Sequence, residues 1–170
     1  MRATVFDSSA VLALLLEQPG ADLVEGLLAK AAEADHPILI SAVNWAEVLS
    51  VVERKHGAAG VEHARRFEAT MPLDVAPSDQ EQAELAALLK NRAGLGLADA
   101  FASALATQRQ AALVTGDREF KAVKKDISVV WLKGEARGAP TGRRFRVQGA
   151  GFRAQGSEFM VHGSRLMVNG

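Results

Sequence analysis

The sequence predicts an α/β fold in which a parallel β-sheet carries helices on both faces. Short apolar stretches that suit strands alternate along the chain with longer stretches that suit helices. The strand stretches are apolar throughout, which is typical of strands that are buried on both sides. At 170 residues, with 48% hydrophobic and 24% charged residues, the chain has the composition of a globular protein.

The first part of the chain contains two strand-then-helix units. The runs ATVF and PILI are short and apolar, as buried strands are, and they occupy residues 3–6 and 37–40. The helical stretches that follow them begin at the cap-type residues Asp7 and Ser41 and end at glycines. The predicted helices of this part cover residues 7–20, 21–35 and 41–57.

The alternation continues to residue 132. SDQEQAELAALLKNRAG begins with cap residues and closes at Gly94, while GLADAFASALATQRQ is a helix of small residues. AALVTG and ISVVWL are the apolar runs of two further strands. In chain order we predict a helix over 60–70, an extended piece at 73–77, helices over 78–94 and 96–110, a strand at 111–116, a short helix at 117–125 and a strand at 127–132.

A change of composition predicts a domain boundary after Lys133. Residues 1–133 carry 14 Lys and Arg against 18 Asp and Glu, a net charge of −4, whereas residues 134–170 carry 6 against 2, a net charge of +4. The second segment is an imperfect seven-residue repeat with a glycine in each unit, which argues against a coiled coil. We expect a low-complexity, flexible tail or weak strand-and-turn pieces. The repeat glycines are Gly149, Gly156, Gly163 and Gly170.

Several classes of protein are disfavoured by composition. The absence of cysteine excludes disulfides and thiolate-bound zinc, and it is compatible with the cytoplasm that we expect for this chain. The four histidines have no metal-ligand spacing. The longest apolar run, AVLALLL, is far shorter than a membrane span of about 20 residues, and no signal-peptide pattern surrounds it.

Two carboxylates are predicted at the same edge of the sheet. Asp7 follows the first strand, and Asp117 follows the strand in LVTGDREF. Ligands of open parallel sheets bind beyond the carboxyl ends of the strands, so both side chains lie where a site is expected. Each of them also has an ordinary structural interpretation as a helix N-cap.

Two further carboxylates lie among apolar residues. At helical spacing, Glu47 has Val43 and Val51 as neighbours, so we expect a carboxylate in or beside a buried stripe, paired with Arg54 or with a metal ion. Asp99 lies in the first turn of LADAFASALA, where the helix dipole alone could stabilise it. Four oxygen donors without cysteine suit Mg²⁺ or Mn²⁺, and a hydrated ion beside an anionic substrate suits phosphoryl transfer.

Four stretches together resemble one protein family. TVFDSSAVLALL, SAVNWAEVLSVV, LGLADAFASALA and LVTGDREF are similar, in this order, to the motifs of PIN domains and in particular of the VapC toxins of toxin–antitoxin pairs. The resemblance covers about residues 2–133. It implies a PIN-like three-layer α/β/α fold and a Mg²⁺- or Mn²⁺-dependent endoribonuclease with a cognate antitoxin. Its metal-binding and catalytic residues here would be Asp7, Glu47, Asp99 and Asp117, with Ser8 and Thr115 as supporting polar residues.

The mechanism expected from these residues is metal-assisted hydrolysis of an RNA phosphodiester. Candidate contacts to RNA phosphates are Arg118, Lys121 and Arg92, although each of them also suits an ordinary solvated surface. The apolar helices of the first half offer surface for a homodimer and for an antitoxin helix.

Three alternatives compete with the nuclease interpretation. A phosphotransfer receiver domain would show adjacent acids after the first strand, and a haloacid-dehalogenase-type phosphatase would show Asp-x-Asp, whereas Ser8 and Ser9 follow Asp7. A non-catalytic PIN-like protein that only binds RNA or acts as a scaffold has no need of four converging carboxylates. We therefore expect an enzyme.

Overall fold

The computed structural model of the chain describes residues 3–132 and the short stretches 146–147, 150–151, 154–155 and 158–159. The chain divides into two compact units, Met1–Glu135 and Ala136–Gly170, and each is described by itself. The predicted boundary at Lys133 and the four repeat glycines lie outside the described residues, so the extent of the domains stays a prediction.

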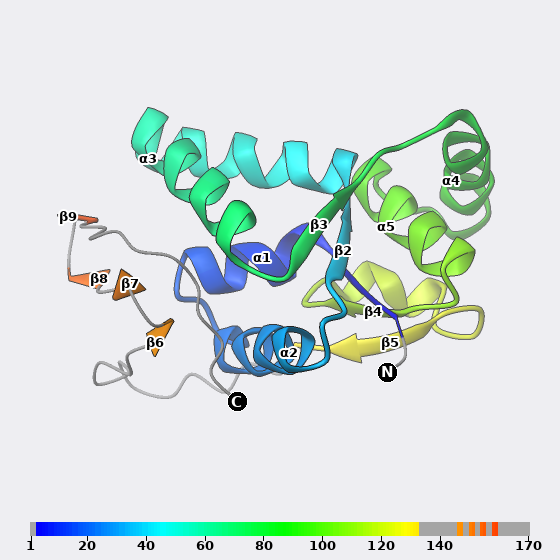
Figure 1. The fold of residues 1–170 in the computed structure, drawn as a ribbon. Helices are drawn as coiled ribbons and strands as arrows, with labels where there is room; N and C mark the ends of the chain where they lie inside the picture. The colour runs from blue at the N-terminus through cyan, green and yellow to red at the C-terminus, as the bar shows by residue number, and fades with distance from the viewer. Residues whose placement is uncertain (1–2, 133–145, 148–149, 152–153, 156–157, 160–170) are drawn as a thin grey trace. The chain divides into compact units, whose positions relative to one another are not determined.

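The first unit is built on a five-stranded sheet in which every neighbouring pair of strands is parallel, as predicted (Figure 1). The strand order is β3-β2-β1-β4-β5, so β1 lies at the centre. The chain extends the sheet from β1 in one direction and then returns to add β4 on the other side. The strands are β1 (Thr4–Phe6), β2 (Ile38–Ser41), β3 (Leu73–Ala76), β4 (Ala112–Thr115) and β5 (Ser128–Trp131).

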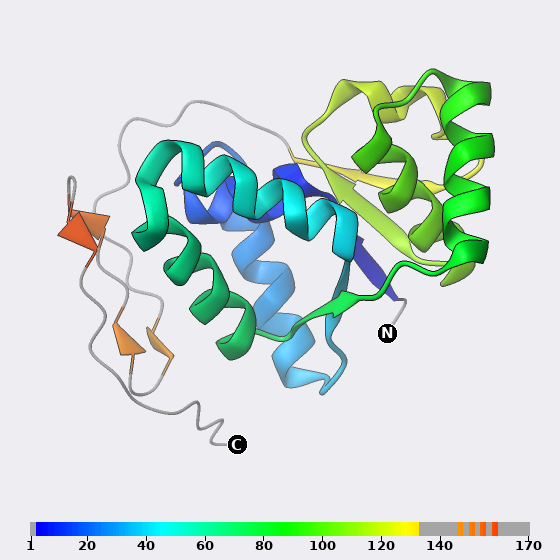
Figure 2. The ribbon, with the colours of Figure 1, turned by 90° about the horizontal axis from the view of Figure 1, so that it is seen from above.

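Helices cover both faces of this sheet, which gives the three-layer arrangement (Figure 2). One face packs against α1, α2 and α3, and the other packs against α4, α5 and the 3₁₀ turn η1. The bounds are α1 (Ser8–Leu15), α2 (Ala21–Glu33), α3 (Ala42–Thr70), α4 (Gln80–Ala93), α5 (Leu97–Gln108) and η1 (Arg118–Ala122).

Burial explains why the strands carry no polar face. Successive side chains of a strand point to opposite faces, and here both faces are core. Phe6 and Val114 pack on the α1–α3 side, whereas their neighbours Val5 and Leu113 pack on the α4–α5 side, and all four are fully buried. The uninterrupted apolar runs are therefore a direct consequence of the three layers.

The two helices predicted over 41–57 and 60–70 form one element, α3, that bends sharply at Gly57. Gly57 has φ 62° and ψ −155°, a conformation open to glycine and unfavourable for residues with a Cβ. The break predicted at this glycine therefore exists, and the helix resumes at once after it.

The second unit contains two short antiparallel strand pairs among its described residues, β6 with β7 and β8 with β9. These strands are β6 (Arg146–Val147), β7 (Ala150–Gly151), β8 (Ala154–Gln155) and β9 (Glu158–Phe159). In the part of the chain that the structure describes, no helix combines the length and hydropathy that crossing a membrane requires.

Candidate active site

The topology of the sheet brings Asp7 and Asp117 to one edge. β1 and β4 are adjacent and parallel, and the connections that leave them run to opposite sides of the sheet. Such a reversal opens a crevice beyond the carboxyl ends of the strands. Asp7 follows β1 as the N-cap of α1, and Asp117 follows β4 as the N-cap of η1. Both residues therefore cap a helix and also lie at the expected site.

Asp7 is a buried carboxylate held by three side chains. Its side chain is 2% exposed. Oδ2 accepts hydrogen bonds from Ser9 Oγ at 2.7 Å and Thr115 Oγ1 at 2.9 Å, while Oδ1 accepts one from Asn44 Nδ2 at 3.1 Å. Burial raises the pKa of Asp7, and the hydrogen bonds from Ser9 and Thr115 oppose that rise. The surrounding donors thus offset part of the cost of burying a charge.

Asn44 links this carboxylate to α3 and is absent from the residues predicted by sequence. It is fully buried, and its Nδ2 donates to both Asp7 Oδ1 and Ser8 Oγ, each at 3.1 Å. Ser41 caps α3, accepts from the Asn44 N–H at 3.1 Å and donates to Asn44 Oδ1. The Ser8 hydroxyl donates to the Asn44 carbonyl oxygen at 3.2 Å, and Ser8 acts on the Asp7 carboxylate only through its backbone N–H. The signal in the sequence is a polar residue four positions before buried Val48.

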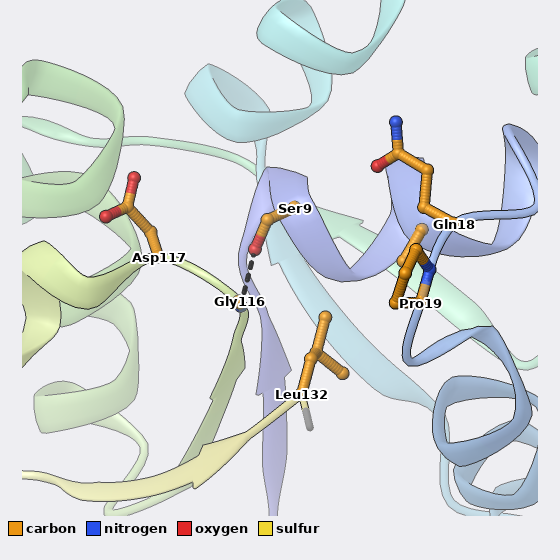
Figure 3. A pocket seen from close by; sticks show the side chains of 7 residues that line it. Ser9, Gln18, Pro19, Gly116, Asp117 and Leu132 are labelled. Atoms are coloured by element: carbon orange, nitrogen blue, oxygen red, sulfur yellow. Dashed lines mark hydrogen bonds between the residues drawn. The ribbon is translucent and has the colours of Figure 1, made fainter. Parts of the chain in front are cut away.

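Ser9 joins α1 to the loop that carries Asp117 (Figure 3). Its Oγ accepts from the Gly116 N–H at 2.9 Å while it donates to Asp7 Oδ2. Thr115 Oγ1 in turn accepts from the Asp117 N–H at 2.9 Å. Gly116 is not among the glycines with positive φ, and a Cβ at this position would lie 3.7 Å from Ser9 Oγ, an ordinary contact, so neither the backbone conformation nor crowding requires a glycine here. The sequence prediction included Thr115 but omitted Ser9.

Glu47 lies beside the buried stripe of α3 and not in it, so the inference of a buried carboxylate is wrong. Glu47 is exposed, and the inward face of α3 consists instead of Asn44, Val48 and Val52. Helical periodicity alone allowed either Asn44 or Glu47 on the inner face of α3. Packing against the sheet turned Asn44 inward. Among the described residues Glu47 has no ion pair with Arg54 either. Glu47 therefore lies beside the buried stripe and faces solvent.

Asp99 shows that the acidic side chains gather at one place. Its pKa is raised to about 7, first by burial and then by the charges of Asp7, Asp117, Glu119 and Glu47. The other three carboxylates predicted from sequence are therefore near enough to Asp99 to disfavour its charge, although Asp99 is only half-buried. Glu119 is a fifth acid in this cluster, and it was missed because it lies on an exposed turn.

The negative charge of the cluster suits a divalent cation, but its side chains are not arranged as a complete set of ligands. Within the described residues, no three Asp, Glu or His side chains are grouped closely enough to hold one ion together. Mg²⁺ normally keeps several waters and takes only one or two protein carboxylates, so three direct ligands are unnecessary. A cation would relieve the repulsion that raises the pKa of Asp99. The donor set and its charge fit Mg²⁺ or Mn²⁺.

The three basic residues predicted as phosphate contacts differ in their surroundings. Arg118 and Lys121 are exposed on η1, the turn that Asp117 caps. Arg92 lies in α4, and its Nη2 donates to Asp126 Oδ2 at 2.8 Å in an exposed ion pair. Arg92 is therefore less available to a phosphate than the two residues of η1.

Comparison with known sequences identifies relatives. The family described as "PIN domain" matches residues 4–126. "Ribonuclease VapC30" of Mycobacterium tuberculosis is 31% identical over 135 residues, which are 75% of this chain and 98% of that protein. "Ribonuclease VapC" of Mycolicibacterium smegmatis is 32% identical over 110 residues, which are 60% of this chain and 81% of that protein.

Solved structures share the fold at lower identity. A "Toxin-antitoxin complex from Klebsiella pneumoniae" contains a chain that superposes with a TM-score of 0.59 at 22% identity. The superposition covers 78% of this chain and 100% of that chain. At this identity the comparison establishes the fold alone.

Proposed function

The chain belongs to the PIN domain family, and on that premise we propose that it is an endoribonuclease toxin of a toxin–antitoxin pair. The proposed reaction is hydrolysis of RNA phosphodiester bonds with Mg²⁺ or Mn²⁺. One observation supports it most: Asp7, Glu47 and Asp117 come from three other parts of the chain and lie close enough to Asp99 to raise its pKa. A cluster of acids that perturbs the pKa of one member is typical of a functional site, and here a cation would neutralise the cluster and attract an anionic substrate.

We assign the roles as follows. Asp7, Glu47 and Asp99 would hold the ion directly or through water, and Asp117 would hold a second ion or orient the attacking water. When bound, the ion lowers the pKa of that water and offsets the negative charge that develops on the phosphate.

The scaffold's contribution is orientation. Ser9, Thr115 and Asn44 hold both oxygens of Asp7, so the direction of this carboxylate is set before an ion or substrate binds. Asp117 has its backbone held by Thr115, and its Oδ1 accepts from the Glu119 N–H at 2.8 Å. Exposed Arg118 and Lys121 beside it would contact RNA phosphates.

The proposed partners are RNA, a cognate antitoxin and a second copy of the chain. The relatives are named as ribonucleases, and the similar solved structure is a toxin–antitoxin complex. The described surface carries exposed apolar side chains that suit protein contacts, namely Leu23 on α2, Leu88 on α4 and Leu97 on α5. Light scattering tests the homodimer, which we expect at twice the chain mass of 18.0 kDa.

The alternative is a PIN-like protein that binds RNA without cleaving it. Purified protein is incubated with structured RNAs in Mn²⁺, with and without excess EDTA. We expect cleavage that EDTA abolishes, that Asp99→Asn lacks, and that the control Asp74→Asn keeps, because Asp74 is an exposed acid of β3 outside the cluster. Binding of RNA with no cleavage by the wild-type chain would favour the alternative.

A further inference from the structure

A pocket adjoins the acidic cluster at the same edge of the sheet (Figure 3). It has a volume of about 340 Å³, which is within the range of roughly 300–1,000 Å³ found for small-molecule sites. Its walls come from α1, the turn after α1, the loop after β4 and the residue after β5. The lining residues are Ser9, Ala13, Gln18, Pro19, Gly116, Asp117 and Leu132.

The pocket shares Asp117 with the acidic cluster and is connected to Asp7 through Ser9. Asp117 belongs to the cluster and also lines the pocket. Ser9 lines the pocket while its Oγ donates to Asp7 Oδ2 at 2.7 Å. The cluster and the pocket are therefore neighbouring parts of one surface. A ligand whose phosphate lies at the carboxylates can place the group next to that phosphate in the pocket.

The lining favours an uncharged ring over an anion. Among the described residues, the pocket has no Lys, Arg or His, and its one charged group is the carboxylate of Asp117. Ala13, Pro19 and Leu132 supply apolar surface. Gln18 is exposed, and its amide, which offers both donors and an acceptor, has no hydrogen bond to the described residues. Unstacked RNA bases are recognised by such apolar walls combined with hydrogen bonds to their edges.

We propose that this pocket binds the base of a nucleotide next to the scissile phosphate, and that it sets the base preference of cleavage at that position. The inference rests on the proposed ribonuclease function. Gln18 is the residue that reads the edge of the base, and Leu132 and Pro19 hold its faces. The ligand class is thus a single ribonucleotide unit of an RNA chain.

Two substitutions probe the pocket while leaving the carboxylates in place. Gln18→Ala removes the amide from an exposed turn. Gly116→Ala adds a methyl group 3.5 Å from Leu132 Cδ1 and 3.7 Å from Ser9 Oγ, which is ordinary contact and narrows the pocket without displacing a neighbour. Gln80→Ala is the control, because Gln80 is also exposed but lies at the start of α4 and bonds to Glu84.

The first measurement is cleavage of an RNA pool of random sequence, with the cut ends sequenced. We expect the wild-type chain to enrich particular bases at one position beside the cut, and Gln18→Ala to reduce that enrichment about three- to tenfold, the effect of one hydrogen bond. Gly116→Ala narrows the pocket, so the base preference at the same position should shift from the larger purines towards pyrimidines. Gln80→Ala should leave the profile as it is.

The second measurement does not depend on cleavage. The four ribonucleoside 5′-monophosphates and ribose 5-phosphate are titrated into ¹⁵N-labelled protein with Mg²⁺. Nucleotides should shift the Gln18 side-chain and Gly116 amide signals, and ribose 5-phosphate should leave the Gln18 signal unmoved. If no RNA is cleaved, the proposed function fails and this titration still decides whether the pocket binds bases.

Three results would overturn the inference. The first is an unchanged cleavage profile in both Gln18→Ala and Gly116→Ala, and the second is the absence of any nucleotide-induced shift at these residues. The third is a Gln18→Ala chain that keeps its profile but resists inhibition by the antitoxin, which would assign the pocket to a protein partner.

Discussion

The turn after β1 and the first turns of α3 each bring a carboxylate to the same acidic cluster, and they hold it in opposite ways. Asp7 is buried, and both of its oxygens accept hydrogen bonds from Ser9, Thr115 and Asn44. Glu47, one turn after Asn44, is exposed, and no hydrogen bond or ion pair fixes it among the described residues. The scaffold therefore orients one of the proposed metal ligands in advance, whereas the other is free to follow a cation.

Replacing Asp7 should have the largest effect on both stability and cleavage. Asp7→Ala removes the acceptor of buried Asn44 and Thr115 and of half-buried Ser9, and we expect a loss of about 3 kcal/mol in the free energy of unfolding. Asp7→Asn keeps an oxygen for Asn44, and the two hydroxyls can rotate to accept from its amide, so its loss should be about 1 kcal/mol or less. Both should abolish cleavage. Urea unfolding beside a cleavage assay measures this, and equal stabilities of the two variants would contradict the role given to the donors.

Replacing Asn44 tests whether the scaffold's orientation of Asp7 matters to function. Asn44→Ala removes the amide that donates to Asp7 and Ser8 and the oxygen that accepts from Ser41, while both serines keep their bonds to the backbone of residue 44; we expect a cost of about 2 kcal/mol. The Mn²⁺ concentration that gives half-maximal cleavage should rise about tenfold. Asn91→Ala, on the exposed side of α4, is the control. An unaltered Mn²⁺ requirement in a destabilised Asn44→Ala chain would make Asn44 purely structural.

The raised pKa of Asp99 predicts how stability depends on pH. Between the ordinary pKa of 3.8 and the folded value of about 7, the folded chain keeps a proton that the unfolded chain has lost. Raising the pH through this window should therefore destabilise the metal-free protein, by about 2 kcal/mol after discounting for partial exposure.

Asp99→Asn separates this effect from the titration of other groups. The variant should lose that part of the pH dependence and be more stable than the wild-type chain at pH 8. Urea unfolding at pH 5 and pH 8 in EDTA provides the measurement. If both chains show the same difference between the two pH values, Asp99 does not carry the repulsion assigned to it. Added Mn²⁺ should stabilise the wild-type chain at pH 8 and not the variant.

Replacing Glu47 should leave stability nearly unchanged. An exposed side chain without partners contributes little, so Glu47→Gln should lie within about 0.5 kcal/mol of the wild-type chain. Its Mn²⁺ requirement should nevertheless rise, because one of the proposed ligands has lost its charge. Calorimetric titration with Mn²⁺ checks this, with Glu53→Gln on an exposed part of α3 as the control. Unchanged affinity for Mn²⁺ would remove Glu47 from the metal site.

Truncation after Lys133 should have the smallest effect on folding and cleavage. The removed residues 134–170 carry a net charge of +4, which would attract RNA without sequence preference. We expect the shortened chain to fold and to cleave RNA, with a modest loss of RNA affinity that disappears at high salt. An unfolded or inactive shortened chain would place the repeats within the working domain.

Local patterns in the sequence determined the secondary structure and its order. Apolar runs without a polar face required strands buried on both sides, and glycines such as Gly57 and Gly94 marked where helices bend or end. The chemistry of the donors was also readable, because carboxylates without cysteine suit a hard divalent cation. These features depend on residues a few positions apart, which is the range over which periodicity and capping act.

Only the tertiary structure decided which side chains meet. Asp7 binds Asn44 and Thr115, which lie 37 and 108 positions away, because the strand order places β1 between β2 and β4. The rotation of α3 that buries Asn44 and exposes Glu47 was set by packing on the sheet, since periodicity alone allowed either residue on the inner face. The bridge from Ser9 to Gly116 and the pocket beside it depend likewise on how α1 packs against the loop after β4.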